Sequence, residues 1–515
     1  MNDAWVLAID QGTTGTTALL LDSSGKVRGR GYAELPQHFP RPGWVEHDGE
    51  EIWRCSTQAA DEALRFAQGH PIAAIGITNQ RETTLVWDRK SGAPVAPAIV
   101  WQDRRTADRC AALKRAGLEP EVRRRTGLVL DPYFSATKLE WLLKHHPGLR
   151  ARARRGELAF GTVDSWLLWK LSGGRVHATD PTNAARTMLY HIGEHRWDDR
   201  LLAEFGVPAG LLPQVLPSSG IFGVTQNAGT IPDGIPIAGN AGDQQAALFG
   251  QGCVEPGQSK NTYGTGCFLL LNTGQRRVAS RSGLLTTVAC GPRGEPAYAL
   301  EGSVFIAGAA LQWLRDGLAI LDSAPASEPM ARSVADTGGV VLVPAFVGLG
   351  APYWRPEVRG ALFGLTRGTT RAHVVRAALE SLAFQTRDLI AAMTRDVGRR
   401  AAGRGDRRAG GGRRAGHGVR MRVLRVDGGA AANDFLMQYQ ADLLGLRVER
   451  PRVVETTALG AGLLAGLATG FWSSHRDLDQ ARQIDRVFEP RMGKTWRDVE
   501  YGRWQRAVTA LLSLG

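Results

Sequence analysis

Cysteine is scarce in this sequence and shows no pairing pattern. The chain has 515 residues and only five cysteines, an odd number, and no two of them have a CxxC spacing. The pattern predicts neither a disulfide framework nor a cysteine-based zinc site, and it favours a reducing, cytoplasmic compartment. The five are Cys55, Cys110, Cys253, Cys267 and Cys290.

Long hydrophobic runs are absent as well. No unbroken apolar segment approaches the ~20 residues that a membrane-spanning helix needs. The first apolar run, residues 5–9, is short and is flanked by Asp3 and Asp10, unlike a secretory signal peptide. We therefore expect no membrane insertion and no cleaved leader.

The composition is that of a globular protein, with 43% hydrophobic and 22% charged residues. Because single cores stop growing at ~250–300 residues, a chain of this length is expected to form at least two domains. Strand-like and helix-like runs alternate in both halves, which predicts layered α/β domains. We place the N-terminal domain at residues 1–250 and the C-terminal domain at residues 259–515.

The net charge of +13 is concentrated in one segment rather than spread over the chain. Residues 395–422 contain ten Arg against two Asp, a local charge of +8 that leaves +5 for the rest. The segment is rich in Gly and Ala, has no apolar periodicity and contains no aromatic residue, so we expect a disordered, solvated insertion at about 396–420. Polyanion binding is the weaker alternative, and no nucleic-acid partner is expected.

The segment DQGTTGTT at residues 10–17 joins two short apolar runs through glycines and threonines. We expect strand, turn and strand, with residues 10–17 as the turn. Gly12 lets the backbone approach a ligand, and the hydroxyls and N–H groups of Thr13 and Thr14 can bind phosphate. Asp10, at the strand end, can hold Mg²⁺ through water. A plain hairpin is the alternative interpretation.

Three further small-residue segments follow in the second half. Residues 261–266 (NTYGTG) precede an apolar strand, and residues 427–433 (DGGAAAN) end a strand and begin a helix, whose N-terminus favours anions. The third combines Glu301-Gly302-Ser303 with Gly308 and Gln312. Each alone is weak evidence, because such turns often serve packing, but together they predict a nucleotide-binding surface.

Asp243 follows a predicted strand and a glycine and precedes a helix-like Ala/Leu segment. It can be a helix N-cap, which is the common role of such an aspartate. An acid at a strand end beside phosphate-binding turns is also where a phosphotransferase places the base that accepts a hydroxyl proton.

Two longer motifs carry a family resemblance. Residues 133–142 (YFSATKLEWL) are similar to the first signature of the FGGY family of carbohydrate and polyol kinases, and residues 360–380 to its second. The resemblance covers nearly the whole chain. It implies two actin-like (ribonuclease H-like) α/β domains with a nucleotide and substrate cleft between them.

Within the family, three long phrases most resemble the members that phosphorylate glycerol. They are residues 76–84, 99–106 and 242–250. The resemblance therefore implies transfer of phosphate from ATP, with Mg²⁺, to glycerol, giving sn-glycerol 3-phosphate and ADP in the first step of glycerol catabolism. It also implies a homodimer or homotetramer.

The resemblance assigns roles to individual residues. Asp243 is the expected catalytic base. The glycerol-binding set is Arg81, Glu82, Trp101, Tyr133, Asp243, Gln244 and Phe268. The nucleotide-binding set is Thr13, Thr14, Gly264, Thr265, Gly308, Gln312, Gly429 and Asn433, with Asp10 for the metal.

The sequence departs from the family at two places that bear on function. Many members have arginine where Thr17 stands in this chain. The positive charge that this arginine places near the phosphates is therefore missing here or comes from another residue. Relatives inhibited by fructose 1,6-bisphosphate have an arginine just before the strand that leads to the catalytic acid. Here Asp233 and Gly234 occupy that place, so we expect a weak response or none.

Two other function classes remain open on sequence grounds. One is a kinase of another polyol or sugar, such as xylulose or erythritol. The other is an actin-like or chaperone-like ATPase switch, for which nucleotide turnover would not require a polyol.

Overall fold

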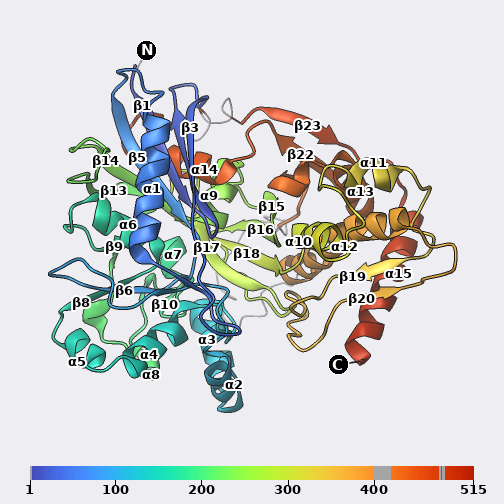
Figure 1. The fold of residues 1–515 in the computed structure, drawn as a ribbon, viewed down its shortest axis with the longest axis horizontal. Coiled ribbons are helices and arrows are strands. Elements are labelled where there is room, and N and C mark those ends of the chain that lie inside the picture. The colour runs from blue at the N-terminus through green and yellow to red at the C-terminus, as the bar shows by residue number, and fades with distance from the viewer. Residues whose placement is uncertain (1–2, 399–418, 475–476, 478–481, 515) are drawn as a thin grey trace, which may run out of the picture.

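The computed structural model describes residues 3–398, 419–474, 477 and 482–514. Most of the arginine-rich segment predicted as an insertion, residues 399–418, lies outside this described part of the chain. Two large β-sheets organise the molecule, the first built from the N-terminal half and the second from the C-terminal half (Figure 1). The predicted α/β class with two domains is confirmed at this level.

The first sheet has six strands in the order β13-β14-β5-β1-β2-β3. β1, β5 and β14 run parallel, whereas β2, β3 and β13 run antiparallel to their neighbours. Their bounds are β1 (Trp5–Gln11), β2 (Gly15–Leu21), β3 (Val27–Glu34), β5 (Ile72–Asn79), β13 (Ser219–Val224) and β14 (Pro236–Gly242).

The second sheet has seven strands in the order β17-β18-β16-β15-β21-β22-β23. Apart from the extra edge strand β17, it repeats the first sheet: three antiparallel strands, then two parallel ones, then an antiparallel edge. The bounds are β15 (Ser259–Tyr263), β16 (Cys267–Gly274), β17 (Leu285–Cys290), β18 (Pro296–Val304), β21 (Val423–Asp427), β22 (Arg447–Pro451) and β23 (Ile484–Phe488). The two halves therefore share one pattern of strand directions, although the edge strand β13 precedes its neighbour β14 in the chain whereas β23 follows β22.

One helix from the C-terminal half packs on the N-terminal sheet. α14 (Thr456–Ala468) contacts β1, β5 and β14 as well as α9 (Asp243–Gly250), and in Figure 1 this orange helix lies among elements of the first half. Glycines allow the contact: a Cβ on Gly460 would stand 1.9 Å from the Ala246 carbonyl oxygen, and one on Gly76 would stand 2.1 Å from that of Ala461. The chain thus returns to its first sheet beside the helix that begins with Asp243.

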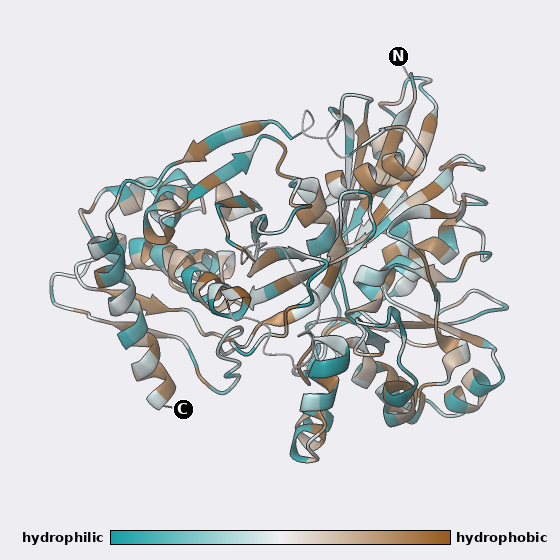
Figure 2. Cartoon of the chain, turned by 180° about the vertical axis from the view of Figure 1, so that it is seen from behind, coloured by the Kyte–Doolittle hydropathy of each residue, from teal (hydrophilic) through white to brown (hydrophobic). Residues whose placement is uncertain are grey.

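Helices cover the other faces of both sheets. α1 (Gly49–Leu64) packs on β2 and β3, and α6 (Val163–Leu171) packs near β5. In the second half α12 (Arg371–Gly398) packs against α13 (Asp434–Leu444), and the terminal helix α15 (Lys494–Ser513) buries Trp504, stacked on Phe384. Figure 2 shows hydrophobic residues along the strands that these helices cover. No helix in the described part of the chain has the length and apolar character of a membrane span.

The remaining elements are short and extend the two halves. In the first half they are β4 (Glu46–His47), β6 (Leu85–Asp88), β7 (Ala98–Ile99), α2 (Ala107–Arg115), α3 (Glu119–Thr126), α4 (Ser135–His145), α5 (Leu149–Arg154), β8 (Leu158–Gly161), β9 (Ala178–Thr179), α7 (Pro181–Ala184), β10 (Tyr190–His191), β11 (Arg196–Trp197), α8 (Asp199–Phe205), η1 (Ala209–Leu211) and β12 (Gln214–Val215). In the second they are α10 (Gly308–Gln312), η2 (Trp313–Gly317), α11 (Ser327–Arg332), β19 (Val341–Val343), β20 (Ala361–Phe363) and η3 (Gly429–Ala432).

Candidate active site

Parallel strands bring the predicted site residues of the first half together. The carboxyl ends of β1, β5 and β14 meet at one edge of the sheet, so the turn after β1, the segment after β5 and the start of α9 are neighbours. The predicted turn is shorter than expected, because Asp10 and Gln11 belong to β1 and Gly15 to Thr17 belong to β2. The Gly12 N–H donates to the Gly15 carbonyl at 2.9 Å and closes this hairpin.

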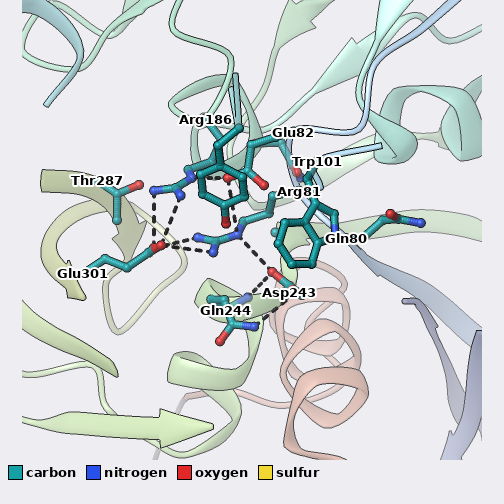
Figure 3. Close-up of polar contacts among 12 residues, drawn as sticks. Gln80, Arg81, Glu82, Trp101, Arg186, Asp243, Gln244, Thr287 and Glu301 are labelled. Carbon is teal, nitrogen blue, oxygen red and sulfur yellow. Dashed lines mark hydrogen bonds and ion pairs between the residues drawn. The ribbon is translucent and has the colours of Figure 1, made fainter. Parts of the chain in front are cut away.

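Asp243 is the first residue of α9, and both of its carboxylate oxygens have partners. Arg81 Nε lies 3.0 Å from Oδ1, and the side chain of Gln244 donates from Nε2 to Oδ2 at 3.1 Å (Figure 3). The Gln244 backbone N–H also donates to Oδ1 at 2.7 Å. Because 29% of the Asp243 side chain remains exposed, the carboxylate is fixed in direction yet open to a substrate.

Four buried charged side chains form a network beside Asp243. Glu301, on β18, accepts from Arg81 Nη1 at 2.7 Å and from Arg186 Nη2 at 3.1 Å. Arg186 Nε also donates to Glu82 at 2.5 Å (Figure 3). All four side chains are at most 1% exposed, so the two cations and two anions compensate each other away from water.

The network keeps Glu301 ionised. Burial alone would raise the pKa of Glu301, but the charges of Arg186 and Arg81 outweigh burial and lower this pKa to about 2. Glu82 differs, because burial prevails over its arginine partners and its pKa is raised. Glu301 is therefore ionised over a wider pH range than Glu82.

The segment that carries Arg81 and Glu82 is held in an uncommon backbone conformation. Glu82 has a φ of +63°, a value rare for residues other than glycine and typical of functional sites. Its carbonyl oxygen accepts from Ser135 Oγ at 3.0 Å and lies 3.4 Å from Lys138 Nζ, which donates to the Tyr133 carbonyl at 2.7 Å. Burial lowers the pKa of Lys138 to about 7. These contacts attach the segment to the start of α4.

The three aromatic side chains of the predicted glycerol-binding set lie together, with Tyr133 against the Arg186 guanidinium. Trp101 meets Tyr133 edge to face at 5.6 Å and Phe268 at 6.5 Å between ring centroids. Trp101 Nε1 also donates to Thr13 Oγ1 at 2.9 Å. The predicted polyol wall and the predicted phosphate turn are therefore directly connected.

The predicted nucleotide-binding turns of the second half also come together. The Gly308 N–H donates to the Gly264 carbonyl at 3.0 Å, and the Ala309 N–H donates to the Thr265 carbonyl at 3.2 Å. A Cβ on Gly308 would stand 2.7 Å from the Gly264 carbonyl oxygen, so the approach requires glycine. Gly264 and Thr265 themselves are exposed.

The other predicted nucleoside residues lie on separate short elements. Gln312 is the exposed last residue of α10, and Gly429 is the exposed first residue of η3. Asn433 caps α13, since its Oδ1 accepts from the Leu436 N–H at 2.9 Å. Because β15 and β21 are parallel, the turns after them share one edge of the second sheet, as the turns after β1 and β5 do in the first.

The chemistry around Asp10 suits a magnesium ion. Burial and the charge of Asp243 raise the pKa of Asp10 to about 8, so a nearby cation would stabilise its ionised form. The described residues contain no group of three or more His, Cys, Asp or Glu side chains that could hold a metal by themselves. Mg²⁺ generally keeps several waters and is held by one or two carboxylates together with substrate phosphates.

Three charged residues at the site are not predicted as site residues from the sequence. Arg186 and Lys260 carry no signal there, and Glu301 stands out only as part of a small-residue segment. Buried charges give no periodic or motif signal, so only their burial in the fold reveals them.

Comparisons with known proteins cover nearly the whole chain. Residues 5–250 match the N-terminal domain of the FGGY family of carbohydrate kinases, and residues 259–469 match its C-terminal domain. The chain is 55% identical to the glycerol kinase of Carboxydothermus hydrogenoformans over 511 residues, covering 99% of this chain and 98% of that protein. It is 56% identical to the glycerol kinase of Azotobacter vinelandii over 510 residues, covering 98% and 97%.

A solved structure agrees as well. The crystal structure of Plasmodium falciparum glycerol kinase with ADP superposes with a TM-score of 0.89 at 34% sequence identity, covering 99% of this chain and 98% of that one.

Proposed function

The chain belongs to the FGGY family of carbohydrate kinases, and we propose that it transfers the γ-phosphoryl group of ATP to glycerol, giving sn-glycerol 3-phosphate and ADP. The two actin-like α/β domains implied by the sequence are the fold of this family. The observation that carries the proposal is the partly exposed Asp243 carboxylate, fixed between Arg81 and Gln244 beside a buried ionic network.

Asp243 acts as the general base in this reaction. Its carboxylate accepts the proton of the terminal glycerol hydroxyl as that oxygen attacks the γ-phosphorus. Arg81 and Gln244 hold the two carboxylate oxygens, so the base is oriented before the substrate binds.

Glycerol needs polar partners for three hydroxyls and an apolar wall for its carbon atoms. We assign the hydroxyl contacts to Arg81, Glu82, Tyr133 and Gln244 and the wall to Trp101 and Phe268. A site that hydrogen-bonds every hydroxyl discriminates against analogues lacking one, because its buried polar groups are then left unpaired.

The nucleotide belongs on the turns at the matching edges of both sheets. We assign the phosphates to Thr13, Thr14 and Thr265 and the nucleoside to the surface formed by Gly308, Gln312, Gly429 and Asn433. Asp10 would hold Mg²⁺ through water, and the bound ion would supply positive charge to the phosphates.

We further infer that the enzyme works in the cytoplasm as a homodimer or homotetramer. All five cysteine thiols are free and buried, which suits a reducing compartment. Light scattering of the purified protein tests the oligomeric state.

The test of function is ADP release measured with and without glycerol. The proposal expects turnover that depends on glycerol and is weak with xylulose or erythritol. Equal ADP release without glycerol would indicate an ATPase switch, and faster turnover of another polyol would indicate a different kinase of the family.

A further inference from the structure

Each oxygen of the Asp243 carboxylate is linked to a charged residue of the second sheet through one intermediate residue. Arg81, the partner of Oδ1, is bound by Glu301 on β18. Gln244, the partner of Oδ2, accepts at its Oε1 a hydrogen bond of 2.5 Å from Lys260 Nζ on β15. Arg81 and Gln244 belong to the first half, whereas Lys260 and Glu301 belong to the second.

Lys260 and Glu301 stand in one row of the second sheet. Lys260 pairs with Leu270 on β16, and Leu270 pairs with Glu301 on β18. Directly paired residues project from the same face of a sheet. The ladder of backbone hydrogen bonds therefore fixes the spacing of the two charged side chains, and both point toward the first half.

Lys260 dictates which way the Gln244 amide faces. An ammonium group only donates, so the amide oxygen of Gln244 must face Lys260 and its NH₂ group must face Asp243. Lys260 is completely buried and also donates to Thr262 Oγ1 at 2.7 Å. Among the described residues, no carboxylate lies within ion-pair distance of its ammonium, which makes Lys260 costly to bury for stability alone.

We propose that Lys260 and Glu301 are positioning residues that orient the Asp243 carboxylate, Lys260 through Gln244 and Glu301 through Arg81. This proposal rests on the proposed function, in which Asp243 is the base. The orientation of the Asp243 carboxylate then depends on both halves of the molecule. Each of its oxygens contacts a residue of the first half, and that residue is bound by a charged residue of the second sheet.

The test compares Lys260→Met and Glu301→Gln with Leu270→Val, a packing change in the same row that leaves the polar contacts in place. Each variant is assayed for kcat, for KM of glycerol and of ATP, and for thermal unfolding. Misplacing a catalytic group by about 1 Å can cost on the order of 100-fold. We expect Lys260→Met to lower kcat about 10- to 100-fold with little change in KM for ATP, and Leu270→Val to leave kcat within about threefold.

The double variant Lys260→Met with Gln244→Ala separates positioning from a direct role. If Lys260 acts through Gln244, the double variant is no slower than Gln244→Ala alone. A full multiplicative loss in the double variant, or a Lys260→Met enzyme as active as Leu270→Val, overturns the proposal.

Removing the Glu301 charge leaves two buried guanidiniums with one buried carboxylate, Glu82, and the partly exposed Asp243, so the Glu301→Gln protein is at risk of unfolding. In that case Lys260→Met tests the Gln244 side, and Glu301→Asp, which keeps the charge but shortens its reach to Arg81, tests the Arg81 side; a kcat equal to that of Leu270→Val overturns the role of Glu301.

The wild-type assay keeps the two claims apart. Lack of glycerol-dependent ADP release by the wild type overturns the proposed function. The coupling between Lys260 and Gln244 is then measured on ATP hydrolysis without glycerol, where water is the nucleophile that Asp243 would activate.

Discussion

The two sides of the site are built differently. On the proposed polyol side, Arg81, Glu82, Arg186 and Glu301 are buried and interlocked. On the proposed nucleotide side, Thr14, Gly264, Thr265, Gln312 and Gly429 are exposed, and the structure is made mainly of backbone turns. On one side the charged groups already contact one another, whereas the other side offers exposed N–H and hydroxyl groups.

This difference follows from what each ligand brings. Glycerol is small and uncharged, so its site has to supply ordered donors and acceptors, and fixed charges in a dry environment supply them well. A nucleotide is large and carries its own charge, so backbone N–H groups and a metal ion suffice. Substitutions on the polyol side should therefore act on chemistry and glycerol binding, and substitutions on the nucleotide side on ATP binding.

The largest effect is expected from Asp243→Asn. Asparagine keeps the shape and one acceptor oxygen but is not a base, and loss of a general base costs roughly 10²–10⁴-fold in rate. We expect kcat to fall by that factor while glycerol still raises the melting temperature of the variant. Turnover close to that of the wild type would exclude Asp243 as the base.

Arg81→Ala should affect glycerol far more than ATP. The loss of a hydrogen bond to a charged group costs about 1.5–3 kcal/mol, or roughly 10- to 150-fold in KM for glycerol. Because Arg81 also lies 3.0 Å from Asp243, kcat should fall as well. Steady-state kinetics with each substrate varied check this.

Arg81→Lys serves as the matched variant, since it keeps the charge beside Glu301 but loses the fork of donors. If KM rises equally for glycerol and ATP in both variants, Arg81 is structural and the comparison between the two sides fails.

The sequence predicted residues whose positions follow from strand ends and glycine turns. Asp243, Thr13 and Gly264 were found because an acid, a hydroxyl or a glycine at a strand end leaves a local pattern. Arg186 and Lys260 leave none, because a lone cation in a turn or a strand looks the same whether it faces solvent or a buried polar partner. The return of α14 to the first sheet was also hidden, since it depends on packing across the whole chain.

Gly308→Ala should sharpen the comparison from the nucleotide side. A Cβ there would stand 2.7 Å from the Gly264 carbonyl oxygen, so the two turns must separate. Overpacking of this kind costs about 1 kcal/mol or more, and we expect KM for ATP to rise roughly fivefold with little change in KM for glycerol. Gly210→Ala is the control, because a Cβ at Gly210 meets no atom within 4 Å. A rise confined to KM for glycerol would contradict the assignment of this turn to the nucleotide.

The smallest expected effect is a dependence of folding stability, rather than of activity, on pH. Burial lowers the pKa of His177 to about 4, and burial lowers that of His47 to about 4 too. The contacts of His177 explain why its ring stays neutral. Its Nε2 lies 2.8 Å from the Phe160 carbonyl, to which it donates, and its Nδ1 accepts from Arg89 at 3.0 Å. A proton on Nδ1 would point at the Arg89 guanidinium, so protonation of the His177 ring is unfavourable.

These histidines should make the protein less stable in mild acid, while Glu301 remains charged. Since their pKa is lower in the folded than in the unfolded chain, they favour folding above pH ~6.5, and this contribution is lost as the pH falls toward 4. Glu301, with a pKa of about 2, loses its contribution only below pH ~4.5. We expect the wild-type melting temperature to drop between pH 7 and pH 5 and His177→Gln, whose amide can both donate and accept, to show a smaller drop. An equal drop in the variant would mean that the sensitivity to mild acid lies elsewhere, and a Glu301→Gln variant that abolished the drop would place it in the ionic network itself.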